Sequence, residues 1–197
     1  LFSMKKLKFI DFLEQVCSFT AKEKELIIHA SEIQTLSKGQ YLLEMNEVCK
    51  HVHFVLKGVI RFYILNDKGD ELTTTFLSEG ELVARIESFL KNAPSNGYLQ
   101  CETSCELISI SKENYVELYK ISKRFGYAMS QLVSLSVAKK MEIQRRLLTE
   151  DGKESFLDFN KFHKNIANRR SKCIYFYTWN GLFCNSSSNN PIGSFSC

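Results

Sequence analysis

Turn residues recur at regular intervals between residues 32 and 110, and this rhythm constrains the fold more than any other feature of the sequence. The stretches between the turns are rich in β-branched and aromatic residues, and turn spacings of about eight to twelve residues are typical of a β-sandwich or barrel. The clearest predicted strands are Phe54–Leu56, Val59–Leu65, Leu72–Phe76, Tyr98–Cys101 and Glu106–Ile110. The turns contain Lys38-Gly39, Lys57-Gly58, Asn66-Asp67-Lys68-Gly69 and Ser78-Glu79-Gly80.

Helical patterns flank this region on both sides. Thr20-Ala21-Lys22-Glu23 has the pattern of a capping box, in which the Thr hydroxyl and the Glu carboxylate each accept a free backbone N–H. Ser111 is placed to cap a helix after the last strand. Apolar residues at spacings of three or four predict helices over residues 4–19, 21–31, 112–119, 123–149 and 155–166.

The helix predicted over residues 123–149 is long for a chain of this size. A helix of roughly 25 residues spans ~37 Å, which is more than a small domain needs, and such helices often carry a dimer seam. We therefore predict a homodimer through this helix. The alternative is that the helix only packs back on its own β domain. The predicted seam residues are Met129, Leu132, Val133, Val137, Met141 and Leu148.

Composition excludes several classes of protein. Of the 197 residues, 44% are hydrophobic and 24% are charged, as in folded domains rather than disordered or collagen-like chains. The net charge is +4, but residues 136–172 hold ten Lys or Arg against five Asp or Glu, which indicates an anionic partner there. Seven cysteines without tight spacing predict reduced thiols. No run approaches the ~18–20 apolar residues of a membrane helix, so we predict a cytoplasmic protein without a membrane partner.

Residues 173–197 contain no Asp, Glu, Lys or Arg, and no helical or strand period continues through them. They hold Trp179, the single tryptophan, and three of the seven cysteines. Two interpretations are open. The segment is either a genuine tail that docks on the protein or in an interface, or the translation of a wrong reading frame after a frameshift near Arg169. Unpatterned composition of this kind is typical of the second.

The candidate metal ligands are His51 and His53, which point to one face of a strand as in jelly-roll cupin enzymes. A cupin site also needs a spaced Glu and a third His, and the other histidines, His29 and His163, lie in predicted helices. No phosphate-binding loop or nucleophile elbow stands out in the sequence. We therefore predict no metal, no catalytic residue and no enzymatic activity.

Five ordered stretches carry a resemblance to a known family: Lys38–Leu43, Val52–Arg61, Asn66–Glu71, Phe76–Val83 and Glu102–Ser111. With the order of the helices, they make residues 5–168 resemble the bacterial cyclic-AMP receptor protein / Fnr (Crp/Fnr) family of transcription regulators. The resemblance implies an α+β fold. In it, a double-stranded β-helix, or jelly roll, forms a sensor domain with flanking helices and a long C-terminal dimerisation helix.

In that family, a cassette of a turn and a short helix binds a cyclic nucleotide. Backbone N–H groups face the phosphate, a Glu holds the ribose, and an Arg about ten residues later pairs with the phosphate. Aligned from Gly80, the Glu position here is Arg85 and the Arg position is Ser95. This argues against a cyclic nucleotide and leaves another small anionic ligand, with Arg85 supplying charge, or no ligand, with Ser88 and Ser95 only capping turns. The cassette residues are Gly80, Glu81, Arg85, Glu87, Ser88, Pro94, Ser95 and Asn96.

The family also implies a DNA-binding helix-turn-helix after the long helix. The expected Leu-Gly turn and basic run do not occur in residues 172–197, so residues that contact DNA remain unknown. We expect a sensor domain over 1–122, a dimerisation helix over 123–150, and over 151–197 a remnant of a DNA-binding domain, truncated or frameshifted after about residue 170. The basic residues before that point either contact phosphates or form a solvated face: Lys139, Lys140, Arg145, Arg146, Arg169 and Arg170.

The predicted function is therefore a Crp/Fnr-like transcription regulator that senses a small ligand and whose DNA-binding module is defective in this chain. The alternative is a stand-alone dimeric β-roll module for ligand binding or interaction, without DNA binding. A gel-shift assay separates these two functions.

Overall fold

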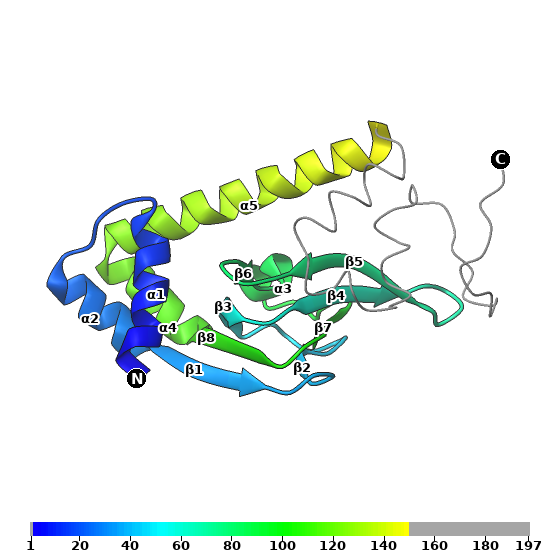
Figure 1. Cartoon of the computed structure of the whole chain (residues 1–197), viewed down its shortest axis with the longest axis horizontal. Helices are drawn as coiled ribbons and strands as arrows, with labels where there is room; N and C mark the ends of the chain where they lie inside the picture. Colours follow the sequence, from blue (N-terminus) through cyan, green and yellow to red (C-terminus); the bar gives the residue numbers. More distant parts are fainter. Residues whose placement is uncertain (1, 150–197) are drawn as a thin grey trace.

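The computed structural model describes residues 2–149 of the chain, and residues 1 and 150–197 lie outside this part. The helix predicted over 155–166, the remnant DNA-binding domain and the uncharged segment 173–197 therefore lie outside the described residues. Figure 1 shows α1, α2 and α4 gathered at one end of a β-roll, with α5 running along its length. The helices are α1 (Phe2–Glu14), α2 (Ala21–Ala30), α3 (Ile86–Lys91), α4 (Lys112–Ile121) and α5 (Lys123–Thr149).

Two four-stranded antiparallel sheets form the roll. Their strand orders are β1-β8-β3-β6 and β2-β7-β4-β5, so neighbouring strands come from distant parts of the chain. The strands are β1 (Ser31–Leu36), β2 (Tyr41–Leu43), β3 (His51–Lys57), β4 (Ile60–Leu65), β5 (Glu71–Leu77), β6 (Leu82–Val83), β7 (Tyr98–Cys101) and β8 (Cys105–Ser111). The α+β jelly-roll fold that the resemblance implied is confirmed, together with its flanking helices and long C-terminal helix. Among helices of the described part, none is long and apolar enough to cross a membrane.

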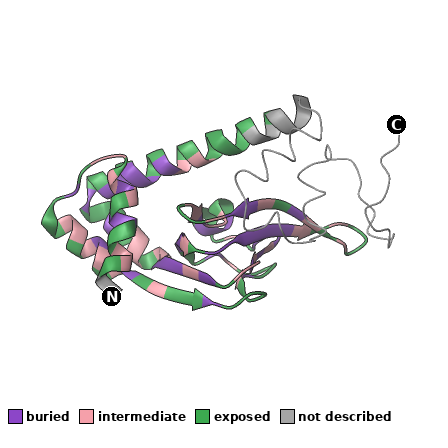
Figure 2. Cartoon of the chain, viewed as in Figure 1, coloured by how far each residue is buried: buried purple, intermediate pink, exposed green. Residues whose placement is uncertain are grey.

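The core lies between the two sheets and continues under the helices at one end (Figure 2). On β4, Ile60 and Phe62 belong to this core, whereas the alternate residue Arg61 bonds to Gln100 on β7, with Nε 3.1 Å from Oε1. Alternation of this kind is what a strand with one face on the core requires. At the helical end, Phe9 and Phe125 are fully buried in the same cluster.

The turn between β3 and β4 requires a glycine. Gly58 has a φ of +104°, and a Cβ there would lie 2.6 Å from the carbonyl oxygen of Ser104 and 2.8 Å from the Sγ of Cys105. Any side chain would force this turn away from the β7–β8 connection. The predicted Lys57-Gly58 turn is therefore confirmed, and sterics explain why it contains a glycine.

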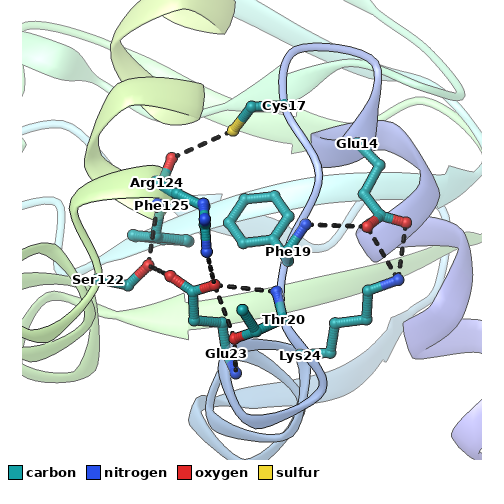
Figure 3. A network of polar contacts seen from close by, with 9 residues as sticks. All are labelled: Glu14, Cys17, Phe19, Thr20, Glu23, Lys24, Ser122, Arg124 and Phe125. Carbon is teal, nitrogen blue, oxygen red and sulfur yellow. Dashed lines mark hydrogen bonds and ion pairs between the residues drawn. The ribbon is translucent and has the colours of Figure 1, made fainter.

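The predicted capping box at Thr20 is present, and it also joins two distant parts of the chain. The Glu23 carboxylate accepts hydrogen bonds from the Thr20 backbone N–H at 2.9 Å, the Ser122 hydroxyl at 2.8 Å and the Arg124 guanidinium at 3.0 Å (Figure 3). Ser122 lies between α4 and α5, and its Oγ accepts the N–H of Phe125 at 3.1 Å. We call Thr20, Glu23, Ser122 and Arg124 the clasp. It ties the start of α2 to the start of α5.

The clasp stabilises the ionised form of Glu23. The backbone N–H of Thr20 is the largest cause, and the Ser122, Thr20 and Arg124 side chains add to it, so that the pKa of Glu23 falls to about 2 from its ordinary 4.5.

Replacing Glu23 by Gln should lower the free energy of unfolding at neutral pH by about 2 kcal/mol, because hydrogen bonds to a charged group contribute about 1.5–3 kcal/mol. Since the folded pKa is depressed, this stabilisation is full above the ordinary pKa of 4.5 and is lost as the pH falls toward 2. Urea unfolding from neutral to acid pH measures both effects. The matched control is E25Q, because Glu25 is exposed on the same helix. An equal loss in both variants would contradict the clasp.

Candidate ligand site

The predicted cassette lies between β6 and β7 and contains the short helix α3. Arg85 stands directly before α3 in an extended conformation, with φ −85° and ψ 91°. At the other end Asn92 adopts the left-handed conformation, with φ 55°, and stops the helix. The ring of Phe89 packs from α3 into the core, so α3 is fixed to the roll by its buried face.

Two buried serines of the predicted site close the cassette on itself. The Ser88 hydroxyl accepts the backbone N–H of Cys49 at 2.8 Å and donates to the carbonyl of Ala93 at 2.5 Å. The Ser95 hydroxyl donates to the carbonyl of Gly97 at 2.8 Å. Both hydroxyls therefore hold the local backbone, which leaves them little capacity for a ligand.

Lys112, which was not predicted as a site residue, secures the end of α3. Its ammonium group donates to the Phe89 carbonyl and, at 2.6 Å, to the Asn92 side-chain oxygen. A cation at a helix C-terminus neutralises the carbonyl groups that the helix leaves unpaired. Lys112 opens α4, so the β8–α4 junction helps to position the cassette.

Four further predicted residues are occupied by contacts within the protein. The Gly80 N–H donates to the Val55 carbonyl at 2.9 Å, and Glu81 accepts the Ser78 N–H at 2.8 Å. The remaining two are Glu87, which pairs with Lys91 at 3.1 Å on the exposed side of α3, and Pro94, which bridges to Val48.

Arg85 is the predicted cassette residue whose side chain keeps hydrogen-bond donors available for a ligand. Its guanidinium lies over the Phe62 ring, 3.9 Å from the centroid, and its Nη2 donates to the side-chain oxygen of Asn96 at 2.9 Å. The side chain is half-buried, and burial lowers its pKa. Within the described residues no carboxylate forms an ion pair with it, although the charge of Glu87, which pairs with Lys91, opposes the lowering of its pKa. A half-buried guanidinium with unused N–H donors suits an oxyanion.

Two lysines of α5 approach the cassette. Lys139 pairs with Glu81 at 2.8 Å. Lys140 is exposed as a whole residue, yet desolvation lowers its pKa, and the charge of Arg85 lowers it further while Glu81 opposes this. Lys140 therefore lies near both Glu81 and Arg85 where α5 passes the cassette. Both lysines were predicted as surface residues, because helical periodicity does not show what a helix lies over.

The predicted dimer residues divide into two groups. Met129 and Leu132, only 1% and 6% exposed, pack into the chain's own core. This corrects their expected place in a seam, since helical spacing shows that a face is apolar but not what covers it. Val133 is half-buried, whereas Val137 and Met141 are exposed. The side chain of Leu148 lies outside the described residues.

The two histidines lie together on β3, with ring centroids 5.8 Å apart. His53 is buried, and its Nδ1 lies 2.7 Å from the hydroxyl of Ser109, which in turn donates to Gln34 at 3.0 Å. Burial, with the charge of His51, lowers the pKa of His53 to about 3, so the ring is neutral at neutral pH. Over residues 2–149, no three His, Cys, Asp or Glu side chains gather closely enough to hold a metal ion.

Comparison with known proteins identifies relatives of this fold. Residues 33–122 match the family described as the cyclic nucleotide-binding domain. The cAMP-activated global transcriptional regulator CRP of Salmonella typhimurium is 20% identical over 81 residues, which cover 41% of this chain and 39% of that protein. A Crp/Fnr-family transcriptional regulator from Eubacterium rectale superposes with a TM-score of 0.64 at 18% identity, covering 83% of this chain and 77% of the other. A cyclic nucleotide-binding domain from Methylobacillus flagellatus gives 0.60 at 10% identity, covering 70% and 80%.

The class of protein follows from the fold and the match together: residues 33–122 form a cyclic nucleotide-binding domain. The predicted resemblance is confirmed, since the chain has CRP homologues and Crp/Fnr regulators among its structural neighbours. The fold of the chain is thus Crp/Fnr-like. The aligned region covers only 39% of the length of the CRP relative.

Replacing Ser88 by Ala should lower the free energy of unfolding by about 2 kcal/mol, because a buried N–H left without an acceptor costs about 1–3 kcal/mol. The exposed Ser104 supplies the control variant S104A, which should change stability by less than about 0.5 kcal/mol. Chemical denaturation of both variants makes the comparison. If S88A were as stable as S104A, the Ser88 hydroxyl would not be holding the cassette.

Proposed function

We propose that this chain is the sensory part of a transcription regulator and that its cassette binds a small oxyanion at Arg85. The observation that supports this most directly is the half-buried Arg85 guanidinium, stacked on Phe62, held by Asn96 and unpaired with any carboxylate of the described part. Lys140 strengthens the positive field at the same place. An oxyanion with two oxygen atoms in one plane fits the fork of donors that a guanidinium presents.

The proposed ligand is not cyclic AMP, although the CRP relative is cAMP-activated. The cassette has an arginine where the family places the glutamate for the ribose, and a self-bonded serine where it places the phosphate-binding arginine. A purine nucleotide would lose both contacts. The Arg85 guanidinium over Phe62 suits a smaller anion.

We further propose that the protein is a homodimer through the second half of α5. The apolar residues Phe125, Met129 and Leu132 at the start of the helix pack into the core, whereas Val137 and Met141, one turn apart on the same face, are 44% and 65% exposed. Exposed large apolar residues on one long helix favour association with a second copy. Anion binding beside Lys140 would then reach the dimer directly, because α5 contributes to both places.

The Crp/Fnr likeness supports a role in transcription in the cytoplasm, and we propose that the DNA-binding module following α5 is defective in this chain. The alternative remains a stand-alone dimeric β-roll that binds a ligand or a protein but no DNA. A gel-shift assay with random-sequence DNA at two salt concentrations distinguishes them. Binding that weakens steeply as salt rises supports remaining contacts with phosphates, and no binding at either concentration supports the alternative.

Replacing Arg85 by Met should abolish anion binding, with inorganic phosphate as the probe and the melting temperature as the readout. Phosphate at one hundred times its dissociation constant should stabilise the wild type by about 2.7 kcal/mol. The control is K91M, because Lys91 is an exposed cation on α3, and it should keep this stabilisation. Equal phosphate effects in R85M and wild type would overturn the site. Cyclic AMP should bind weakly at most.

Replacing both Val137 and Met141 by Glu should convert the dimer to a monomer, because four like charges would face each other across the seam. Sedimentation velocity at micromolar concentration measures the change. Leu65, 39% exposed at the end of β4, offers the control L65E, which should remain dimeric. A monomeric wild type would refute the dimer outright.

A further inference from the structure

Asn96 is the asparagine of residues 2–149 that a glycine follows directly, and a second such pair, Asn180-Gly181, lies outside the described residues. Asparagine followed by glycine is the sequence in which a side-chain amide is lost most readily, because a residue without Cβ lets its backbone nitrogen approach the preceding side chain. Asn96 is exposed, so water reaches its amide group.

The fold requires the glycine of this pair. Gly97 is buried directly before β7, and a Cβ there would lie 2.5 Å from the carbonyl oxygen of Tyr63 and 2.8 Å from the Cζ of Phe62. Any larger residue would push the turn away from β4. The susceptible pair is therefore built into the cassette, against the same aromatic ring over which Arg85 lies.

The neighbouring groups match the needs of an attack by the Gly97 nitrogen on the Asn96 amide. The N–H of Gly97 donates to the Oγ of Ser95 at 3.3 Å, so this hydroxyl lies where the proton must leave. The Oδ1 of Asn96 accepts a hydrogen bond from Nη2 of Arg85 at 2.9 Å. A cation bonded to a carbonyl oxygen stabilises the negative charge that develops there when a nucleophile adds to the carbon.

We propose that Asn96-Gly97 is a self-modification site, at which water converts the Asn96 amide to a carboxylate and so closes the oxyanion site at Arg85. The Gly97 nitrogen attacks Cγ of Asn96 and forms a C–N bond, while the amide nitrogen leaves as ammonia with the Gly97 proton. Water then adds to one of the two carbonyls of this cyclic imide, its C–N bond breaks, and the backbone nitrogen regains a hydrogen. The product is aspartate or isoaspartate at position 96, and one water replaces one ammonia.

The consequence for the site follows from the contact that already exists. The new carboxylate would stand where the Asn96 amide now accepts the bond from Arg85. Carboxylate and guanidinium form strong charge-assisted hydrogen bonds, so Arg85 would gain a partner within the chain and lose its capacity for a free anion. This consequence rests on the proposed oxyanion site, whereas the modification itself does not.

Peptide mapping of the full chain tests the modification. The folded protein is incubated at mildly alkaline pH and digested with trypsin, and a sample without incubation gives the background of the digestion. Peptide 92–112 contains Asn92 and Asn96 as its asparagines. We expect the amide-to-carboxylate mass change at Asn96, with isoaspartate among the products, while Asn92, which alanine follows, stays unchanged. Equal conversion of the two asparagines, or none, would overturn the site.

The role of Arg85 is tested by the rate of the same conversion. R85M should slow it by about tenfold, because a hydrogen-bond donor to the developing oxyanion is lost. K91M is the matched control, since Lys91 is an exposed cation on α3, and it should keep the wild-type rate. Equal rates in R85M and wild type would refute the participation of the guanidinium.

The closing of the oxyanion site is tested separately with N96D and phosphate. N96D should lose the rise in melting temperature that phosphate gives the fresh wild type, whereas S104D, which adds the same charge at the exposed Ser104, should keep it. Retention of the phosphate effect in N96D would refute the switch. If phosphate does not stabilise the fresh wild type either, the proposed oxyanion function fails and the switch with it, and peptide mapping still decides the modification.

Discussion

The Glu23 carboxylate is the contact on which the arrangement of the helices depends. It accepts hydrogen bonds from the start of α2 and from the joint between α4 and α5, two places about a hundred residues apart in the chain. Ser122 turns the chain at this joint and also caps the next helix through Phe125. Because α5 begins there, the clasp determines the direction in which α5 leaves the helical end and passes the cassette (Figure 1).

The cassette keeps the backbone conformation of a ligand site but has different side chains at the positions that would contact a ligand. Ser88, Ser95 and Lys112 hold the loop and α3 in place by bonds within the protein. The shape therefore does not depend on a ligand. What a ligand would meet is limited to Arg85 over an aromatic ring, with Lys140 near it. The site combines a structural frame that needs no occupant with a concentration of positive charge that favours one.

The features that sequence predicts well here are those set by local chemistry. The capping residues Thr20 and Ser111, the turn at Gly58 and the span of α5 depend on hydrogen bonds and sterics within a few residues. β1 was not predicted, because its two buried residues are at its ends and its conformation is fixed by pairing with β8.

The site was only partly predictable for the same reason. Arg85 was found through the resemblance, which aligns it with a position that contacts a ligand in other proteins. Lys112 and Lys140 were not found as site residues, because they lie 27 and 55 positions further along the chain and only the folded roll brings them near it. Likewise, the burial of Met129 depends on α1 and α4 packing around α5, which periodicity does not report.

Because α5 is long, a small tilt at its start produces a large displacement at its end. Its first turns are fixed in the core. Beyond Leu132, an ion pair between Lys139 and Glu81 connects the helix to the roll. A 27-residue helix is about 40 Å long, so a tilt of about 5° at its base would move its far end by about 3–4 Å. A displacement too small to disturb the core at Phe125 would thus become a large one at the far end. A rigid rod with one fixed end converts a small change in charge near the cassette into movement at a distance.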